Sequence, residues 1–110
     1  MQITDLQISQ VNSQIQALIN AGSFYGKKLS DAGISGISTP EDFEKLPFSE
    51  KNDLREAYPL GLMTAPEEEI VRIHSSSGTT GLPVIIPYTA KDVDDWAVMF
   101  ARCYETAGIT

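Results

Sequence analysis

The sequence has little positive charge, one cysteine and no long apolar run, and each shortage excludes a class of protein. Its 110 residues carry 8 lysines and arginines against 15 acidic residues, a net charge of −7, which disfavours binding to nucleic acid or anionic membranes. The apolar stretches are far shorter than the roughly 20 residues of a membrane-spanning helix, and no basic-then-apolar signal sequence opens the chain. The single Cys103 cannot form an internal disulfide. We therefore expect a cytoplasmic protein without nucleic-acid or membrane partners.

The most informative stretch is a loop of glycine and hydroxyl side chains at residues 75–83, between apolar runs at 70–74 and 84–88 that we predict to be strands. Backbone N–H groups and hydroxyl donors concentrated in one loop are typical of phosphate-binding sites. No lysine follows Gly81, and the two glycines, Gly78 and Gly81, are only three positions apart. This excludes the Walker A pattern, in which a lysine reaches the outer phosphates.

The rest of the chain is predicted to be mainly helical. Apolar spacing and capping residues indicate helices at about 5–20, 23–32, 40–46 and 49–54, a solvated turn at 65–69, and a long amphipathic helix from Thr89 to Gly108. Residues 1–69 thus form a helical N-terminal region, and residues 70–110 form a strand-loop-strand-helix unit. Uncharged polar side chains on the first helix, such as Gln10 and Gln14, would suit contact with another protein as well as with water.

The two predicted strands have the near-continuous apolar pattern of strands that are covered on both faces in an α/β sheet. Two strands alone do not make an independently stable sheet. We therefore expect an α/β fold in which the chain is the N-terminal part of a larger enzyme or a sequence cut short. A self-contained helical minidomain with one hairpin is the alternative.

The segment Ser76-Ser77-Gly78-Thr79-Thr80-Gly81-x-Pro83 resembles the phosphate-binding signature of the adenylate-forming superfamily of acyl-CoA synthetases. Flanking blocks narrow the resemblance to phenylacetate-CoA ligases, and they include Phe24-Tyr25, Leu46-Pro47-Phe48, Asp53-Leu54-Arg55, Tyr58-Pro59, Arg72-Ile73-His74 and Ala101-Arg102. The likeness runs from about Phe24 to the end of the chain. It would cover the first quarter or so of a family member, and residues 70–110 would be the start of the nucleotide-binding domain.

The resemblance implies an AMP-forming aryl-acid CoA ligase that uses ATP, Mg²⁺ and CoA. In this family a carboxylate such as phenylacetate first forms an acyl-adenylate and pyrophosphate, and the CoA thiol then displaces AMP. By analogy, the residues that hold the β- and γ-phosphates are Ser76, Ser77, Gly78, Thr79, Thr80 and Gly81. The family is often dimeric, which the polar first helix would allow. No catalytic residue or metal ligand can be assigned, because the family's other motifs lie outside this sequence.

Two positions depart from the family pattern and leave the loop without a cation. Val84 stands where the common superfamily signature has a lysine after Pro83, and Leu82 occupies a site where many ligases of this branch have lysine. Neither change removes a hydrogen-bond donor. Affinity for a triphosphate is then expected to depend on Mg²⁺ and on groups outside this sequence.

Four other features have a structural interpretation that we favour over a functional one. His74 is expected to be a structural residue at a strand end rather than a phosphate ligand. The helical stripe that contains Trp96, Phe100 and Tyr104 is expected to be core rather than the wall of an aryl pocket. Cys103 is expected to be a buried thiol. The acidic run at 67–69 is expected to be a solvated turn rather than a metal site.

Two function classes remain open. The first is the ligase, with an adenylating enzyme for another carboxylate as its variant; the isolated 110 residues are then expected to be inactive. The second is a non-catalytic fragment or helical module that binds a partner protein through its first helix.

Overall fold

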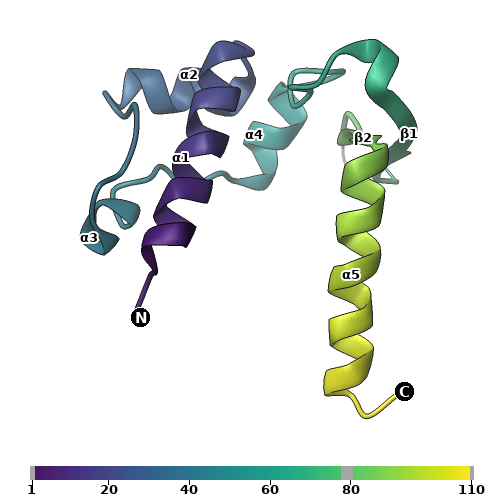
Figure 1. Ribbon diagram of the computed structural model, residues 1–110. Helices are drawn as coiled ribbons and strands as arrows, with labels where there is room; N and C mark the ends of the chain where they lie inside the picture. Colours follow the sequence, from purple (N-terminus) through teal and green to yellow (C-terminus); the bar gives the residue numbers. More distant parts are fainter. Residues whose placement is uncertain (1, 78–80, 110) are drawn as a thin grey trace.

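The computed structural model describes residues 2–77 and 81–109 and contains helices and one antiparallel hairpin (Figure 1). The predicted combination of helices, a strand-loop-strand hairpin and a long final helix is confirmed, which is compatible with an α/β fold. In chain order the elements are α1 (Asp5–Asn20), α2 (Phe24–Asp31), α3 (Pro40–Phe43), α4 (Lys51–Glu56), the 3₁₀ helix η1 (Glu67–Glu69), β1 (Ile70–Ser75), β2 (Ile85–Thr89) and α5 (Ala90–Thr106).

Local capping explains where most of the helices begin. Thr4, Thr39 and Thr89 each accept a hydrogen bond from the backbone N–H three residues later, and the residue at that position bonds back to the threonine N–H. Such reciprocal caps satisfy donors that the first helical turn would otherwise leave without partners. Ser23 also caps α2, by accepting a hydrogen bond from the N–H of Gly26, although glycine has no side chain to return the bond. These helix starts were predicted correctly.

The boundaries of two predicted helices were wrong. The helix α3 ends at Phe43 rather than near residue 46. The helix α4 begins at Lys51, after Glu50 rather than at Ser49, and extends to Glu56. The side chain of Asp53 accepts a hydrogen bond from the Glu50 N–H at 2.9 Å, so the donor that fixes the start lies one residue later than expected.

The helices α1 and α2 pack together around a small apolar core. Ile15 of α1, Leu29 of α2 and Ile37 in the following segment are buried, and Leu29 is fully so. Gly26 permits the close approach, because a Cβ at this position would lie 2.1 Å from the backbone oxygen of Leu18. The packing of α2 against α1 therefore depends on a glycine in the first turn of α2.

The polar side chains of α1 are partly used within the chain. The side-chain amide of Asn12 donates to the Ile37 carbonyl at 2.8 Å and accepts from the Ile37 N–H at 2.7 Å. Gln16 donates to the Ser35 carbonyl at 2.6 Å. These bonds attach the segment after α2 to α1, so Asn12 and Gln16, two of the uncharged polar residues of the first helix, have internal roles.

A partly buried ion pair connects α2 to α4. The Lys28 ammonium donates to Asp53 at 2.7 Å and to the Phe48 carbonyl at 2.7 Å. The bond from Lys28, together with the Glu50 N–H, holds the pKa of the Asp53 carboxyl below its usual value. A single carboxylate thus caps α4 and joins it to α2.

The sheet consists of two antiparallel strands in the part of the chain that the structure describes. Arg72 pairs with Tyr88 and His74 with Ile86, and a bulge lies between Ile70 and Arg72. Val71 and Ile73 are each 60% exposed. Among the described residues, the face of the hairpin that carries Val71 and Ile73 therefore has no covering layer, as the sequence predicted.

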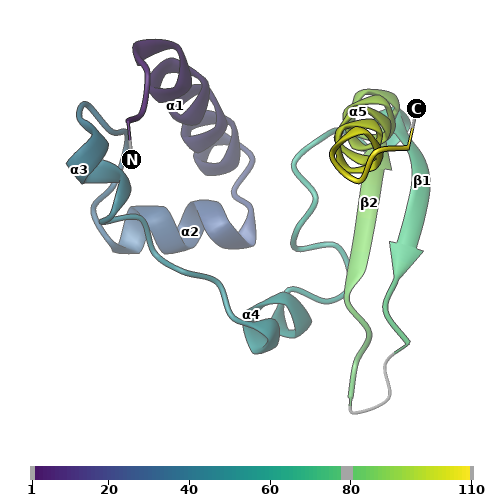
Figure 2. The ribbon, with the colours of Figure 1, turned by 90° about the horizontal axis from the view of Figure 1, so that it is seen from below.

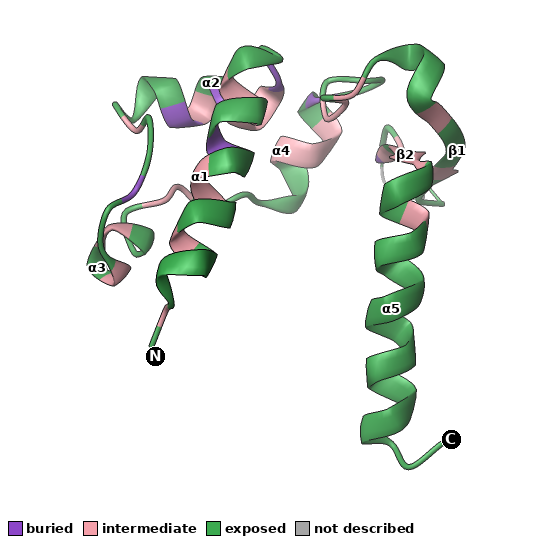
Figure 3. Cartoon of the chain, in the orientation of Figure 1, coloured by how far each residue is buried: buried purple, intermediate pink, exposed green. Residues whose placement is uncertain are grey.

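The helix α5 follows β2 directly and extends away from the sheet (Figures 1 and 2). Figure 3 shows it exposed along nearly all of its length. Trp96, Phe100 and Tyr104 are 38%, 46% and 54% exposed, and Cys103 is exposed as well. The predictions of a core stripe and a buried thiol were therefore wrong for this chain, because among the described residues the hairpin contacts α5 near Trp96 and leaves most of the helix exposed. Among the described residues, no helix combines the length and apolarity needed to cross a membrane.

Candidate functional site

The candidate site is the loop that joins β1 to β2. Its base is closed by Ser76 and Val84, which face each other at the ends of the strands. The Ser76 N–H donates to the Val84 carbonyl at 3.0 Å, and the Val84 N–H donates to Ser76 Oγ at 2.9 Å. The hairpin thus continues one pair beyond the strands and holds the two ends of the loop together.

The structure describes three of the six predicted phosphate-binding residues. Ser76, Ser77 and Gly81 lie at the two ends of the loop and are all exposed. Gly81 has φ = +137°, a conformation that side-chain-bearing residues rarely adopt. Gly78, Thr79 and Thr80 lie outside the described residues, so their predicted role stays a prediction.

The hydroxyl of Ser76 already has a partner within the hairpin, which limits how it could bind a ligand. Its Oγ is engaged as the acceptor for the Val84 N–H, while a hydroxyl also has one O–H to donate. Its exposed neighbour Ser77 presents a second hydroxyl beside it. Sequence reasoning treated the two serines alike and missed that Ser76 also has a structural role. Only a register that places Val84 opposite Ser76 reveals it.

Replacing Ser76 by alanine is expected to loosen the base of the loop. The Val84 N–H would lose its side-chain acceptor, and an unsatisfied donor at a largely buried position costs about 1–3 kcal/mol. Amide hydrogen exchange at Val84, followed by NMR, should become faster in Ser76→Ala and stay unchanged in the matched control Ser77→Ala. Equal exchange rates in the two variants would contradict the structural role of Ser76.

The electrostatics of the described loop residues come from dipoles rather than from full charges. The described residues at the start of the loop are three serines, at 75–77. Those at its end are Gly81, Leu82 and Pro83, so none of these described residues is a cation. Leu82 is 55% exposed, and a lysine there would reach solvent at the loop. Hydroxyl and backbone donors can bind an ionised oxygen strongly, and they fit a phosphate group.

Aromatic rings support the hairpin on the side that faces α5. The His74 ring lies 4.8 Å from the Tyr88 ring and 5.4 Å from the Trp96 ring, between ring centroids. Tyr88 and Trp96 are nearly parallel, with centroids 5.9 Å apart. Rings at these distances attract one another beyond simple burial. These contacts agree with the structural role that we predicted for His74, immediately before the serines of the loop.

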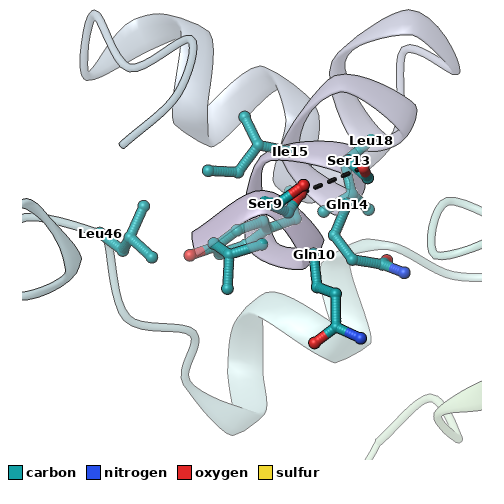
Figure 4. A pocket seen from close by; sticks show the side chains of 9 residues that line it. Ser9, Gln10, Ser13, Gln14, Ile15, Leu18 and Leu46 are labelled. Carbon is teal, nitrogen blue, oxygen red and sulfur yellow. Dashed lines mark hydrogen bonds between the residues drawn. The ribbon is translucent and has the colours of Figure 1, made fainter. Parts of the chain in front are cut away.

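A hollow of about 520 Å³ lies elsewhere, on the surface of α1. Figure 4 shows Leu46 across from the helix, with Gln10 and Gln14 extending from it. Its lining residues carry no formal charge at neutral pH that could fix a carboxylate or a phosphate. Because α1 and the hairpin lie apart in both views of the chain (Figures 1 and 2), we assign this hollow no part in the loop's chemistry.

The chain is similar to several proteins that share the name phenylacetate-coenzyme A ligase. It is 43% identical over 86 residues to the phenylacetate-coenzyme A ligase of Pseudomonas putida, a match that covers 76% of this chain and 20% of that protein. The ligase of Thermus thermophilus is 44% identical over 87 residues, covering 77% of the chain and 20% of the relative. The ligase of Aromatoleum evansii is 35% identical over 105 residues, covering 94% and 24%.

No protein-family model matches the chain. Its similarity to the ligases nevertheless includes most of its residues, while the chain spans only about a fifth to a quarter of the length of these relatives. The loop and its flanking blocks had predicted this resemblance, and the comparisons confirm it. This chain is a homologue of a portion of the phenylacetate-coenzyme A ligases.

Proposed function

We propose that this chain provides the nucleotide-phosphate loop of an AMP-forming ligase that converts phenylacetate, ATP and CoA to phenylacetyl-CoA, AMP and pyrophosphate. The observation that carries the proposal is the similarity of 35–44% to four phenylacetate-coenzyme A ligases. The hairpin supports it, because its paired strands bring the two ends of a serine-rich loop together at Ser76 and Val84.

The proposed reaction has two steps, formation of an acyl-adenylate and transfer of the acyl group to CoA. A carboxylate oxygen of the acid attacks the α-phosphorus of ATP, and the bond to the bridging oxygen breaks to release pyrophosphate. The CoA thiol, losing its proton, then attacks the acyl carbon and displaces AMP. Charge accumulates on the β- and γ-phosphates during the first step, so donors held at these groups stabilise its transition state.

In this proposal the loop binds the leaving phosphates through hydroxyl and backbone donors. Ser77 and Gly81 present exposed groups at opposite ends of the loop, and glycine lets the backbone come close to an oxyanion. Thr79 and Thr80 would add two hydroxyls between them. Since the loop has no cation, neutralisation of the triphosphate falls to Mg²⁺ and to groups outside this sequence.

The two alternative functions would use different parts of the chain. A ligase for another carboxylate would use the same loop, because the acid pocket is not assigned to these residues. A helical protein-binding module would use the polar side of α1. That module is less favoured, because Asn12 and Gln16 are bonded to residues 35–37 of the same chain.

A chimera tests the proposal. The segment of the Pseudomonas putida ligase that is 43% identical over 86 residues would be replaced by the matching part of this chain. Phenylacetate-dependent exchange between ATP and labelled pyrophosphate would then be measured. We expect exchange within about tenfold of the parent enzyme, since one tenfold step corresponds to only ~1.4 kcal/mol of transition-state stabilisation. A folded chimera without exchange would refute the proposal, and the isolated chain is expected to show none.

A further inference from the structure

Three rings from three elements meet where α5 contacts the hairpin. They are His74 of β1, Tyr88 of β2 and Trp96 of α5, and are called the ring cluster here. The His74 ring lies 4.8 Å from the Tyr88 ring and 5.4 Å from the Trp96 ring, the latter pair at an interplanar angle of 70°. The Tyr88 and Trp96 rings are stacked, 13° from parallel with centroids 5.9 Å apart. Each ring therefore contacts both of the others.

The ring cluster lies on the face of the hairpin that the first turns of α5 cover. Successive side chains of a strand point to opposite faces. His74 pairs with Ile86, and Tyr88 stands two residues further along β2, so the two rings are diagonal neighbours on one face. Ile73 points to the other face and is 60% exposed, whereas His74 is half-buried. His74 is thus the last residue of β1 whose side chain is held against α5.

The serines of the loop follow His74 directly. Two residues after it, the Ser76 N–H donates to the Val84 carbonyl at 3.0 Å, and the Val84 N–H donates to Ser76 Oγ at 2.9 Å. The strand end from which Ser76 and Ser77 leave is therefore held in two ways. Hydrogen bonds to Val84 fix its spacing from β2, and the ring cluster fixes its position against α5.

The contacts of His74 suit a role in positioning better than a role as a phosphate ligand. Its ring lies against Tyr88 and Trp96 on the face that α5 covers. Donors stabilise developing charge when they lie about 2.7–3.1 Å from it, and a misplacement of about 1 Å can cost about a hundredfold in rate. A ring that fixes the strand end can therefore affect phosphate chemistry without touching a phosphate.

We propose that His74 is a positioning residue for the phosphate loop and acts through its ring contacts with Tyr88 and Trp96. The ring cluster holds the strand end so that the donors of Ser76 and Ser77 meet the β- and γ-phosphates of the nucleotide. The first turns of α5 thereby support the nucleotide site through Trp96. This inference rests on the proposed function.

The first test measures pyrophosphate exchange in the chimeric ligase with three variants at position 74. His74→Phe keeps a ring, His74→Asn keeps a polar nitrogen without the ring, and His74→Ala keeps neither. We expect His74→Ala and His74→Asn to raise the KM for ATP about tenfold and to lower the maximal rate about a hundredfold, with the KM for phenylacetate unchanged. His74→Phe should stay within about threefold of the parent chimera, because phenylalanine can make the same edge and face contacts.

The two KM values separate positioning from a loss of folded protein. A variant that only lost folded enzyme would show a lower rate with both KM values unchanged. Full activity of His74→Asn with a defect in His74→Phe would make a ring nitrogen the phosphate ligand and overturn the inference. Parent KM values for ATP in all three variants would overturn it as well.

The contribution of α5 is tested by removing rings from that helix. Trp96→Ala should raise the KM for ATP as His74→Ala does, and the double variant should be little worse than either single variant, because residues in contact couple. Tyr104→Ala is the matched control, since it removes a ring from the same helix about two turns beyond Trp96, outside the ring cluster. It should leave the KM for ATP unchanged. Additive effects of His74→Ala and Trp96→Ala would contradict a shared role.

The last measurement uses the 110-residue chain and does not depend on catalysis. Trp96→Ala should shift the amide resonances of Ser76 and Ser77 in NMR spectra, whereas Tyr104→Ala should leave them in place. Unmoved serine amides in Trp96→Ala would overturn the inference. A chimera of unaltered sequence that performs no pyrophosphate exchange would refute the proposed function, and the NMR comparison would still decide whether the ring cluster holds the strand end.

Discussion

Replacing both Thr79 and Thr80 by valine in the chimeric ligase is expected to reduce phenylacetate-dependent pyrophosphate exchange by about a hundredfold or more. Valine keeps the shape of threonine and removes its hydroxyl. Loss of one donor to a developing oxyanion commonly costs about 10²–10³ in rate, and hydrogen bonds to ionised acceptors are about twice as strong as neutral ones. Without a cation in the loop, little else in residues 75–83 could compensate.

The control for this double variant is Thr64→Val, which removes a hydroxyl from an exposed position outside the loop. It should leave exchange unchanged. Circular dichroism would establish that both proteins are folded. Normal pyrophosphate exchange in the double variant would exclude these threonines from phosphate binding and reduce the loop to an ordinary strand connection.

Replacing Gly26 by alanine is expected to separate α1 from α2. The new Cβ would lie 2.1 Å from the oxygen and 2.6 Å from the carbon of the Leu18 carbonyl, both of them backbone atoms that cannot move aside without moving the helix. Overpacking of this kind costs about 1–3 kcal/mol and occasionally more. Alanine gains about 1 kcal/mol over glycine in a helix interior, so the clash outweighs the gain.

The measurement for Gly26→Ala is amide hydrogen exchange across α1 and α2, with far-UV circular dichroism for helix content. Exchange should become faster in both helices, including at Leu29, because the core that Leu29 fills would open. Lys27→Ala changes the adjacent exposed residue of the same helix and should have little effect. Increased helix content in Gly26→Ala would show that α2 can shift away from Leu18 without loss.

The starts of the helices could be predicted from the sequence because their causes are local. Thr4, Thr39 and Thr89 each cap a helix through a residue three positions later, and such a cap requires no distant part of the chain. The end of α3 and the start of α4 were predicted less well. At the start of α4, the Asp53 side chain binds the Glu50 N–H, which makes Glu50 rather than Ser49 the residue that precedes the helix.

Only some properties of the loop could be predicted from the sequence. The sequence identified the kinds of donor, the absence of a cation and the resemblance to ligases, because these depend on residue type and spacing. The second role of Ser76, as acceptor for the Val84 N–H, depends on the pairing of two residues that lie eight positions apart in the sequence. That register is a property of the folded hairpin.

By itself, then, the sequence determined the starts of four helices, the kinds of donor in the loop and the relation to one kind of ligase. The tertiary structure alone decided which side chains are covered. Asn12, polar and apparently free, is held by Ile37, whereas Phe100 and Cys103, apolar in character, are exposed. The physical reason is that capping acts over three residues of chain, while burial depends on what distant polypeptide is present to pack against each surface.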